Sequence, residues 1–151
     1  MKSADRVIIT ILLILNLAAC ASPKVEISVR DAWVRTSVVD SPMGDIIHLG
    51  DSTAYMLIQN DGSQADTLTG AESLAARNIE IHQTTMVNNF PSMLPVASVL
   101  IPANSKVRLE DSSCHLMLID LKEDLISREE IEIVLIFELA GRIPVKVVVR
   151  E

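Results

Sequence analysis

The sequence predicts an all-β sandwich or barrel, and two observations lead to that prediction. Short apolar runs recur along the chain and are separated by turn residues, as in folds built from many short strands. Aromatic residues are scarce, with one Trp, one Tyr and two Phe, so the core must consist mainly of Val, Ile, Leu and Met. Val and Ile favour strands, because their branched side chains pack well on a pleated surface.

The expected strands follow one another along the chain. The first is the alternating run 25–29, which continues through 32–34. The second, 53–59, ends at Asn60-Asp61-Gly62, a strong turn signal. The last two are joined by a turn at Ala140-Gly141-Arg142. In full, the later runs are 67–71, 79–83, 93–101, 106–109, 115–121, 131–139 and 143–150.

Three segments are expected to fall outside the strands. Ser73–Arg77 alone has a helical pattern. The polar stretch 37–51, which contains Pro42, is predicted to be a loop of above-average length. A further loop, which holds Pro91, is expected to separate the run that ends at 83 from the run that begins at 93.

The N-terminus has the pattern of an export signal. Lys2 and Arg6 precede an apolar segment, Val7–Leu17, which is shorter than the roughly 20 residues that a membrane-spanning helix needs. Leu17-Ala18-Ala19 then leads into Cys20. Small residues before a cysteine resemble a bacterial lipobox, in which the cysteine is acylated and becomes the new N-terminus. An ordinary signal peptide with a chance cysteine is the alternative.

These features predict the domain organisation and the location of the protein. We expect a lipoprotein signal peptide at 1–19, a lipidated tether at 20–24 and one β domain at 25–151. The mature chain would be periplasmic and anchored to the membrane through its lipid. A net charge of −7 argues against nucleic-acid binding. Cys114 would have no disulfide partner and is expected to be a small, buried apolar residue.

Two histidines and two methionines form a candidate metal site. His115 and Met117 are two residues apart in a predicted strand, so their side chains point to the same face, whereas Leu116 and Cys114 point to the other. His82 ends an alternating run, and Met93 follows it after ten residues. Taken singly, each of these residues is more often structural. Their clustering in a chain with only three histidines favours a shared role.

The donor types suit Cu(I). A thioether is a soft ligand that selects Cu(I) over hard ions, and imidazole is accepted by several metals. Methionine needs no deprotonation and forms no disulfide, which suits an oxidising compartment. Zinc favours Cys, His and carboxylate ligands, so two methionines argue against zinc.

The spacing of these four residues resembles that of a known family. The spacing His, ten residues, Met, twenty-one residues, His-x-Met is that of the periplasmic PCu(A)C copper chaperones, and it is met by His82, Met93, His115 and Met117. Similar segments extend over about Val25 to Glu151; they are Asp31-Ala32-Trp33-Val34-Arg35, Ala54-Tyr55-Met56, Ala65 to Ala71 and Phe137 to Val149.

The resemblance implies a cupredoxin-like Greek-key β fold, a Cu(I) site on the four motif residues and no enzymatic activity. It also implies delivery of copper toward the binuclear copper centre of cytochrome c oxidase, together with a Sco-type thiol protein. The turn Asp111-Ser112-Ser113-Cys114 departs from the glycine-rich turn that is usual in the family.

Two alternatives stay open at the level of sequence: an electron-transfer cupredoxin, and a metal-free structural lipoprotein of the envelope. Met43, His48 and Met86 are left as residues of an auxiliary site or of none.

Overall fold

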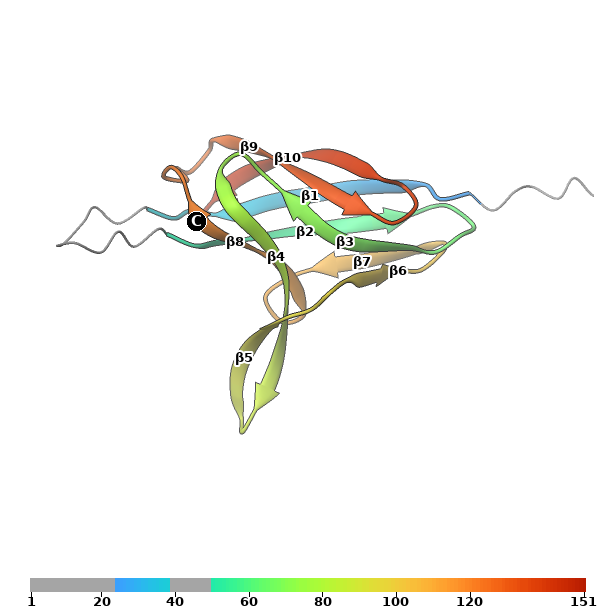
Figure 1. The fold of residues 1–151 in the computed structure, drawn as a ribbon, viewed down its shortest axis with the longest axis horizontal. Coiled ribbons are helices and arrows are strands. Elements are labelled where there is room, and N and C mark those ends of the chain that lie inside the picture. The colour runs from blue at the N-terminus through green and yellow to red at the C-terminus, as the bar shows by residue number, and fades with distance from the viewer. Residues whose placement is uncertain (1–23, 39–49) are drawn as a thin grey trace, which may run out of the picture.

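Ten strands build the part of the chain that the structure, a computed structural model, describes: residues 24–38 and 50–151 (Figure 1). In chain order they are β1 (Ile27–Arg35), β2 (Ser52–Asn60), β3 (Asp66–Glu72), β4 (Ala76–Val87), β5 (Phe90–Pro95), β6 (Val99–Ile101), β7 (Ser105–Leu109), β8 (Cys114–Leu121), β9 (Glu130–Phe137) and β10 (Arg142–Arg150).

All ten strands belong to one sheet, and nine of them follow the order β5-β4-β8-β2-β1-β10-β9-β3-β6. β7 pairs with the second half of β2, beyond the part of β2 that pairs with β8. The first and last strands, β1 and β10, run parallel, and every other pair is antiparallel. The prediction of an all-β fold is confirmed. Among the described residues no helix is long and apolar enough to cross a membrane.

The core is mainly aliphatic, as the composition predicts. Alternation along the strands supplies it. In β4, Ile79 and Ile81 face inward and pair with Leu118 and Leu116 of β8, and all four are buried. The same alternation sends the intervening residues of β4 and β8 to the opposite face of the sheet.

The prediction of helical structure at Ser73–Arg77 is wrong. Ser73 to Ala75 form a turn, and β4 already begins at Ala76. The Ser73 hydroxyl donates to the carbonyl of Glu132 and accepts from the amide of Ala75, as serine does in turns. A segment of five residues is also too short for a helix to be stable without strong packing.

The expected loop around Pro91 is instead a long hairpin. β4 extends to Val87, and β5 returns beside it from Phe90 after a turn at Asn88 and Asn89. Both asparagines have positive φ, 52° and 64°, as a two-residue type I′ turn requires. Pro91 is accommodated because β5 is an edge strand. Figure 1 shows this hairpin projecting from the body of the sheet.

The run expected at 93–101 is divided between two strands. β5 ends at Pro95, and β6 begins at Val99. The two strands have different partners, because β5 pairs with β4 and β6 pairs with β3 at the far edge of the sheet. Cys20, Met43 and His48 lie outside the described residues, so the predictions of acylation and of an auxiliary site there stay predictions.

Candidate metal centre

The two histidines of the motif lie directly opposite each other. β4 and β8 are antiparallel, and their register pairs His82 with His115. Because directly opposed residues project to the same side, both rings lie on the face away from Ile81 and Leu116. The ring centroids are 6.1 Å apart. Two residues that are distant in the sequence are thereby brought together.

The two methionines lie on the same face as the histidines. Met117 is two residues beyond His115 on β8 and pairs with Glu80 of β4. Met93 of β5 pairs with Thr84, which is two residues beyond His82 on β4. Met93 is therefore a diagonal neighbour of His82 on the hairpin, within reach of a long side chain. Half of its surface, 50%, is exposed, so Met93 forms the open side of the cluster.

His115 is the most buried polar residue of this cluster. Its exposed fraction is 0%, and neither Nδ1 nor Nε2 has a hydrogen-bond partner in the part of the chain that the structure describes. Buried nitrogen atoms without a partner destabilise a fold by about 1–3 kcal/mol each, and native proteins rarely tolerate them without a functional reason. A metal ion bound at one ring nitrogen would compensate part of this penalty.

His82 is held by a neighbouring carboxylate. Its Nε2 lies 2.9 Å from Oε2 of Glu80, the residue two positions earlier on the same face of β4. If Nε2 carries the proton and donates to Glu80, the lone pair of Nδ1 is free for a metal ion. Carboxylates that accept from the second nitrogen of a ligating histidine fix its orientation and raise its basicity.

The environment keeps His115 neutral. Burial lowers the pKa of His115, and the adjacent His82 lowers it further, while Asp111 and the backbone at Ser113 act in the opposite direction. A neutral imidazole is the form that binds metal ions, so the site needs no proton release from His115 near neutral pH.

Cys114 is turned away from the cluster. It pairs with Gln83 and packs against the hydrophobic core, on the opposite face from His115. Burial raises the pKa of its thiol, which disfavours the thiolate that binds metals. Cys114 was predicted to be a small, buried apolar residue; it does pack against the core, but it is only partly buried.

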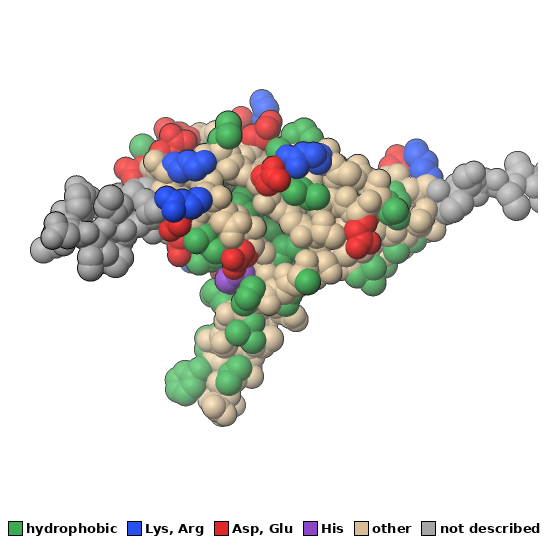
Figure 2. All heavy atoms as spheres, viewed as in Figure 1, with side chains coloured by type: hydrophobic (Ala, Val, Ile, Leu, Met, Phe, Trp, Pro, Cys, Tyr) green, Lys and Arg blue, Asp and Glu red, His purple; other side chains and the backbone are tan. Residues whose placement is uncertain are grey.

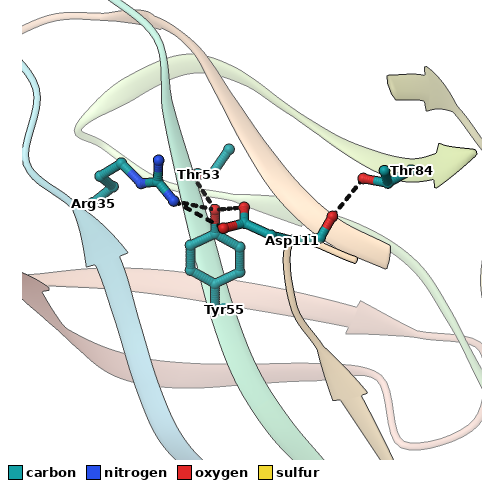
Figure 3. Close-up of polar contacts among 5 residues, drawn as sticks. All are labelled: Arg35, Thr53, Tyr55, Thr84 and Asp111. Carbon is teal, nitrogen blue, oxygen red and sulfur yellow. Dashed lines mark hydrogen bonds and ion pairs between the residues drawn. The ribbon is translucent and has the colours of Figure 1, made fainter. Parts of the chain in front are cut away.

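A polar network anchors the turn that leads into His115 (Figure 3). Asp111 lies in this turn, between β7 and β8. Its carboxylate accepts a hydrogen bond from the Tyr55 hydroxyl and lies 3.0 Å from the Arg35 guanidinium. Tyr55 also accepts from Arg35 at 3.2 Å and lies 2.7 Å from the hydroxyl of Thr53. Burial raises the pKa of Tyr55, with a further contribution from Asp111, so the phenol stays protonated.

The same turn is attached to the hairpin strand β4. Thr84 donates its hydroxyl to the carbonyl of Asp111 at 2.6 Å, and its amide donates to the carbonyl of Ser113 at 2.9 Å. Tyr55 continues the connection toward His115, since the two ring centroids are 6.3 Å apart. The network therefore links the hairpin strand β4, at Thr84, to the turn that leads into β8, the strand that carries His115 and Met117.

Sequence reasoning singled out the four residues that the structure brings to one face of the sheet, but it missed Glu80, Tyr55 and Asp111. Glu80 could have been found, because it precedes His82 by two residues in an alternating strand. Tyr55 and Asp111 are 56 residues apart, and no local signal joins them. Within 24–38 and 50–151, no group of three His, Cys, Asp or Glu residues could hold a metal ion. The candidate donors on this face are the paired histidines and the two methionines beside them.

Solved structures with a similar fold are PCuAC domains. The copper-bound PCuAC domain from PmoF2 matches with a TM-score of 0.62 and 22% identity, over 84% of this chain and 95% of that domain. The apo PCuAC domain from PmoF1 matches with a TM-score of 0.65 and 21% identity, over 84% and 96%. Cu(I)-DR1885 from Deinococcus radiodurans matches with a TM-score of 0.53 and 26% identity, over 87% and 83%. The predicted cupredoxin-like fold is confirmed.

Sequence comparison gives the family. "Putative lipoprotein Lxx21020" from Leifsonia xyli subsp. xyli (strain CTCB07) is 29% identical over 126 residues, which are 83% of this chain and 70% of that protein. The family model described as "Putative lipoprotein LpqE-like" matches residues 27–149, nearly the whole β domain. The family matched is thus LpqE-like, while the resemblance to PCu(A)C proteins is supported at the level of the fold. The chain belongs to the LpqE-like lipoprotein family.

Proposed function

We propose that this protein is a metallochaperone that carries Cu(I) on His82, Met93, His115 and Met117. One observation supports this function above all: the register of β4 and β8 pairs the two histidines on a face that also bears both thioethers. The buried nitrogens of His115 have no hydrogen-bond partner among residues 24–38 and 50–151, which is expected of side chains that bind an ion.

The chemistry of the donor set supports Cu(I) as the cargo. Two neutral imidazoles and two thioethers form a soft, uncharged set of four ligands, which favours Cu(I) over Cu(II) and over hard ions. Copper is present in the fold relatives as well, since the PmoF2 domain is copper-bound and DR1885 holds Cu(I). A carrier rather than an enzyme is proposed, because the ion is the cargo of the site.

The cellular role is proposed from the resemblance to PCu(A)C chaperones. The protein would be acylated at Cys20, would face the periplasm, and would pass copper toward the binuclear centre of cytochrome c oxidase together with a Sco-type protein. Membership in a lipoprotein family supports the anchor.

An electron-transfer cupredoxin is the less favoured function. A blue-copper site needs a cysteine thiolate beside two histidines. Cys114 lies on the core side of β8, and burial raises the pKa of its thiol. A metal-free structural role fits poorly with a histidine that is wholly buried and unpartnered.

Competition with a Cu(I) chelator tests the proposed function. Met93→Leu and Met117→Leu keep side-chain volume and apolar character, so the fold should survive with a loss of less than about 1.5 kcal/mol. Each removes one soft ligand, so Cu(I) affinity should fall sharply while any Cu(II) binding suffers less. Met56→Leu is the matched control, because Met56 is only 1% exposed and lies in the core. Unchanged Cu(I) affinity in both ligand variants would place the site elsewhere.

A further inference from the structure

Met86, on the projecting hairpin, lies on the same face as the proposed copper ligands. It pairs with Pro91, one step further along the hairpin than the pair Thr84–Met93. Met86 and His82 are four residues apart on β4, so they share a face. Met86 is thus a diagonal neighbour of Met93, at about 7–8 Å between strands, a separation that long side chains bridge.

The thioethers on this face form a series that leads from the body of the protein into solvent. Met117 is partly buried, Met93 is 50% exposed, and Met86 is 67% exposed. At the inner end, His115 has no exposed surface at all. An ion therefore cannot reach the His115 nitrogens directly from water, and the exposed thioethers lie at the open end of the cluster.

The hairpin offers an ion no ligand that is both charged and hard. No charged residue occurs between Glu80 and Lys106, although 22% of the whole chain is charged. Figure 2 shows apolar side chains along the projecting hairpin and a histidine where it leaves the body. A pair of thioethers in such a segment would select Cu(I) by softness and would hold it less tightly than a site with two imidazoles.

We infer that Met86 and Met93 form a transient entry and exit site for Cu(I), an inference that rests on the proposed function. The ion binds first to both thioethers and then moves inward, exchanging its bond to the Met86 sulfur for a bond to a histidine nitrogen. Met93 remains bound throughout, and copper stays Cu(I), so no electron is transferred. Release to a recipient follows the same exchange in reverse.

Methyl-labelled methionine provides a test that needs no destabilising variant. Ag(I), a soft closed-shell ion, serves as the probe in a titration followed by the methyl resonances, which are assigned with single Met→Leu variants. The Met93 and Met117 resonances should shift with the first equivalent. The Met86 resonance should shift or broaden during the same addition, because the ion exchanges between the Met86–Met93 pair and the histidine site. The Met56 resonance should not move, since this residue is buried in the core. A Met86 resonance that is unmoved through two equivalents overturns the inference.

Transfer kinetics test the same inference in function. Cu(I) passes from the loaded protein to excess bicinchoninate, and its rate is compared between the parent and Met86→Leu. We expect transfer to slow by at least about fivefold, because the variant removes the intermediate through which the ion leaves. The equilibrium affinity for Cu(I) depends only on the end states and should stay within about twofold of the parent. Phe90→Leu is the matched control, since Phe90 is 74% exposed on the other face of the hairpin.

The outcomes separate this inference from the proposed function. Equal transfer rates for the parent and Met86→Leu overturn the entry site and leave the copper site intact. A loss of equilibrium affinity as large as that of Met93→Leu also overturns it, because Met86 would then belong to the main site. A parent protein that binds no Cu(I) overturns both. Circular dichroism checks the fold of each variant, and little change is expected at a residue that is 67% exposed.

Discussion

Replacement of His115 by leucine should stabilise the metal-free protein while abolishing the proposed copper site. His115 is fully buried, and both of its ring nitrogens lack partners. Each unsatisfied nitrogen destabilises the fold by about 1–3 kcal/mol, and partial relaxation reduces the total. An apolar side chain of similar volume removes this penalty, so we expect His115→Leu to gain about 1–3 kcal/mol in free energy of unfolding.

Urea denaturation of the metal-free proteins measures this gain. With a slope near 2 kcal/mol per molar urea, the midpoint should rise by about 1 M. His82→Leu is the control, because His82 already has a partner in Glu80 and loses that hydrogen bond on substitution. It should show no such gain. Excess Cu(I) should then reverse the order, since ligand at about 1,000 times its dissociation constant stabilises the parent by about 4.1 kcal/mol and leaves His115→Leu unchanged.

The reasoning fails if the metal-free variant is less stable than the parent. Leucine could lower stability simply because its shape does not fit this position. His115→Met, which has a more adaptable side chain, is therefore measured as well. If both variants lose more than about 1 kcal/mol, the His115 ring is a structural component whose nitrogens are satisfied in solution. The unpartnered nitrogens of His115 would then no longer support a copper site.

Three further predictions follow from the site and its surroundings. The pKa of His115 is lowered in the folded state, so the unfolded chain binds more protons than the folded protein below about pH 6.5. The free energy of unfolding of the metal-free parent should therefore fall more than that of His115→Leu between pH 7 and pH 5, as measured by urea titration. Tyr55→Phe deprives Asp111 of a hydrogen bond and should lower the free energy of unfolding by about 1–2 kcal/mol. Glu72→Gln breaks the exposed ion pair with Arg142 and should change the free energy of unfolding little. Equal losses in the two variants would contradict the role given to the network. Cys20→Ala should release soluble or unprocessed protein, and unchanged membrane fractionation with an unmodified Cys20 by mass spectrometry would refute acylation.

Period-two alternation made much of the site predictable from the sequence. It places His115 and Met117 on one face of β8 and sends Leu116 to the core, as the structure has them. The strand runs of the body were found for the same reason, since each has an apolar inner face. Local patterning of this kind depends only on residues two apart, so a single sequence contains it.

Pairing between distant strands was not predictable in the same way. The register that pairs His82 with His115 joins residues 33 positions apart and depends on the packing of the whole sheet. The hairpin was missed for a different reason. Pro91 suggested a loop, yet an edge strand tolerates proline, and the Asn88-Asn89 turn is a weaker signal than Asn-Gly.

The length of β4 explains why the candidate site is both buried and accessible. The inner part of β4, through Ile81, packs in the core, whereas its outer end, from Thr85 to Val87, pairs with β5 alone and projects as the hairpin. His82 lies at the junction of the two parts. The face of β4 that bears His82 therefore lies beside the buried His115 at its inner end, where burial lowers the pKa of that imidazole. At its outer end the same face bears the exposed Met86, which pairs with Pro91 of β5. A one-residue shift of the β4–β8 register would turn His82 toward the core, so the aliphatic packing of Ile79 and Ile81 fixes the geometry on which copper binding would depend.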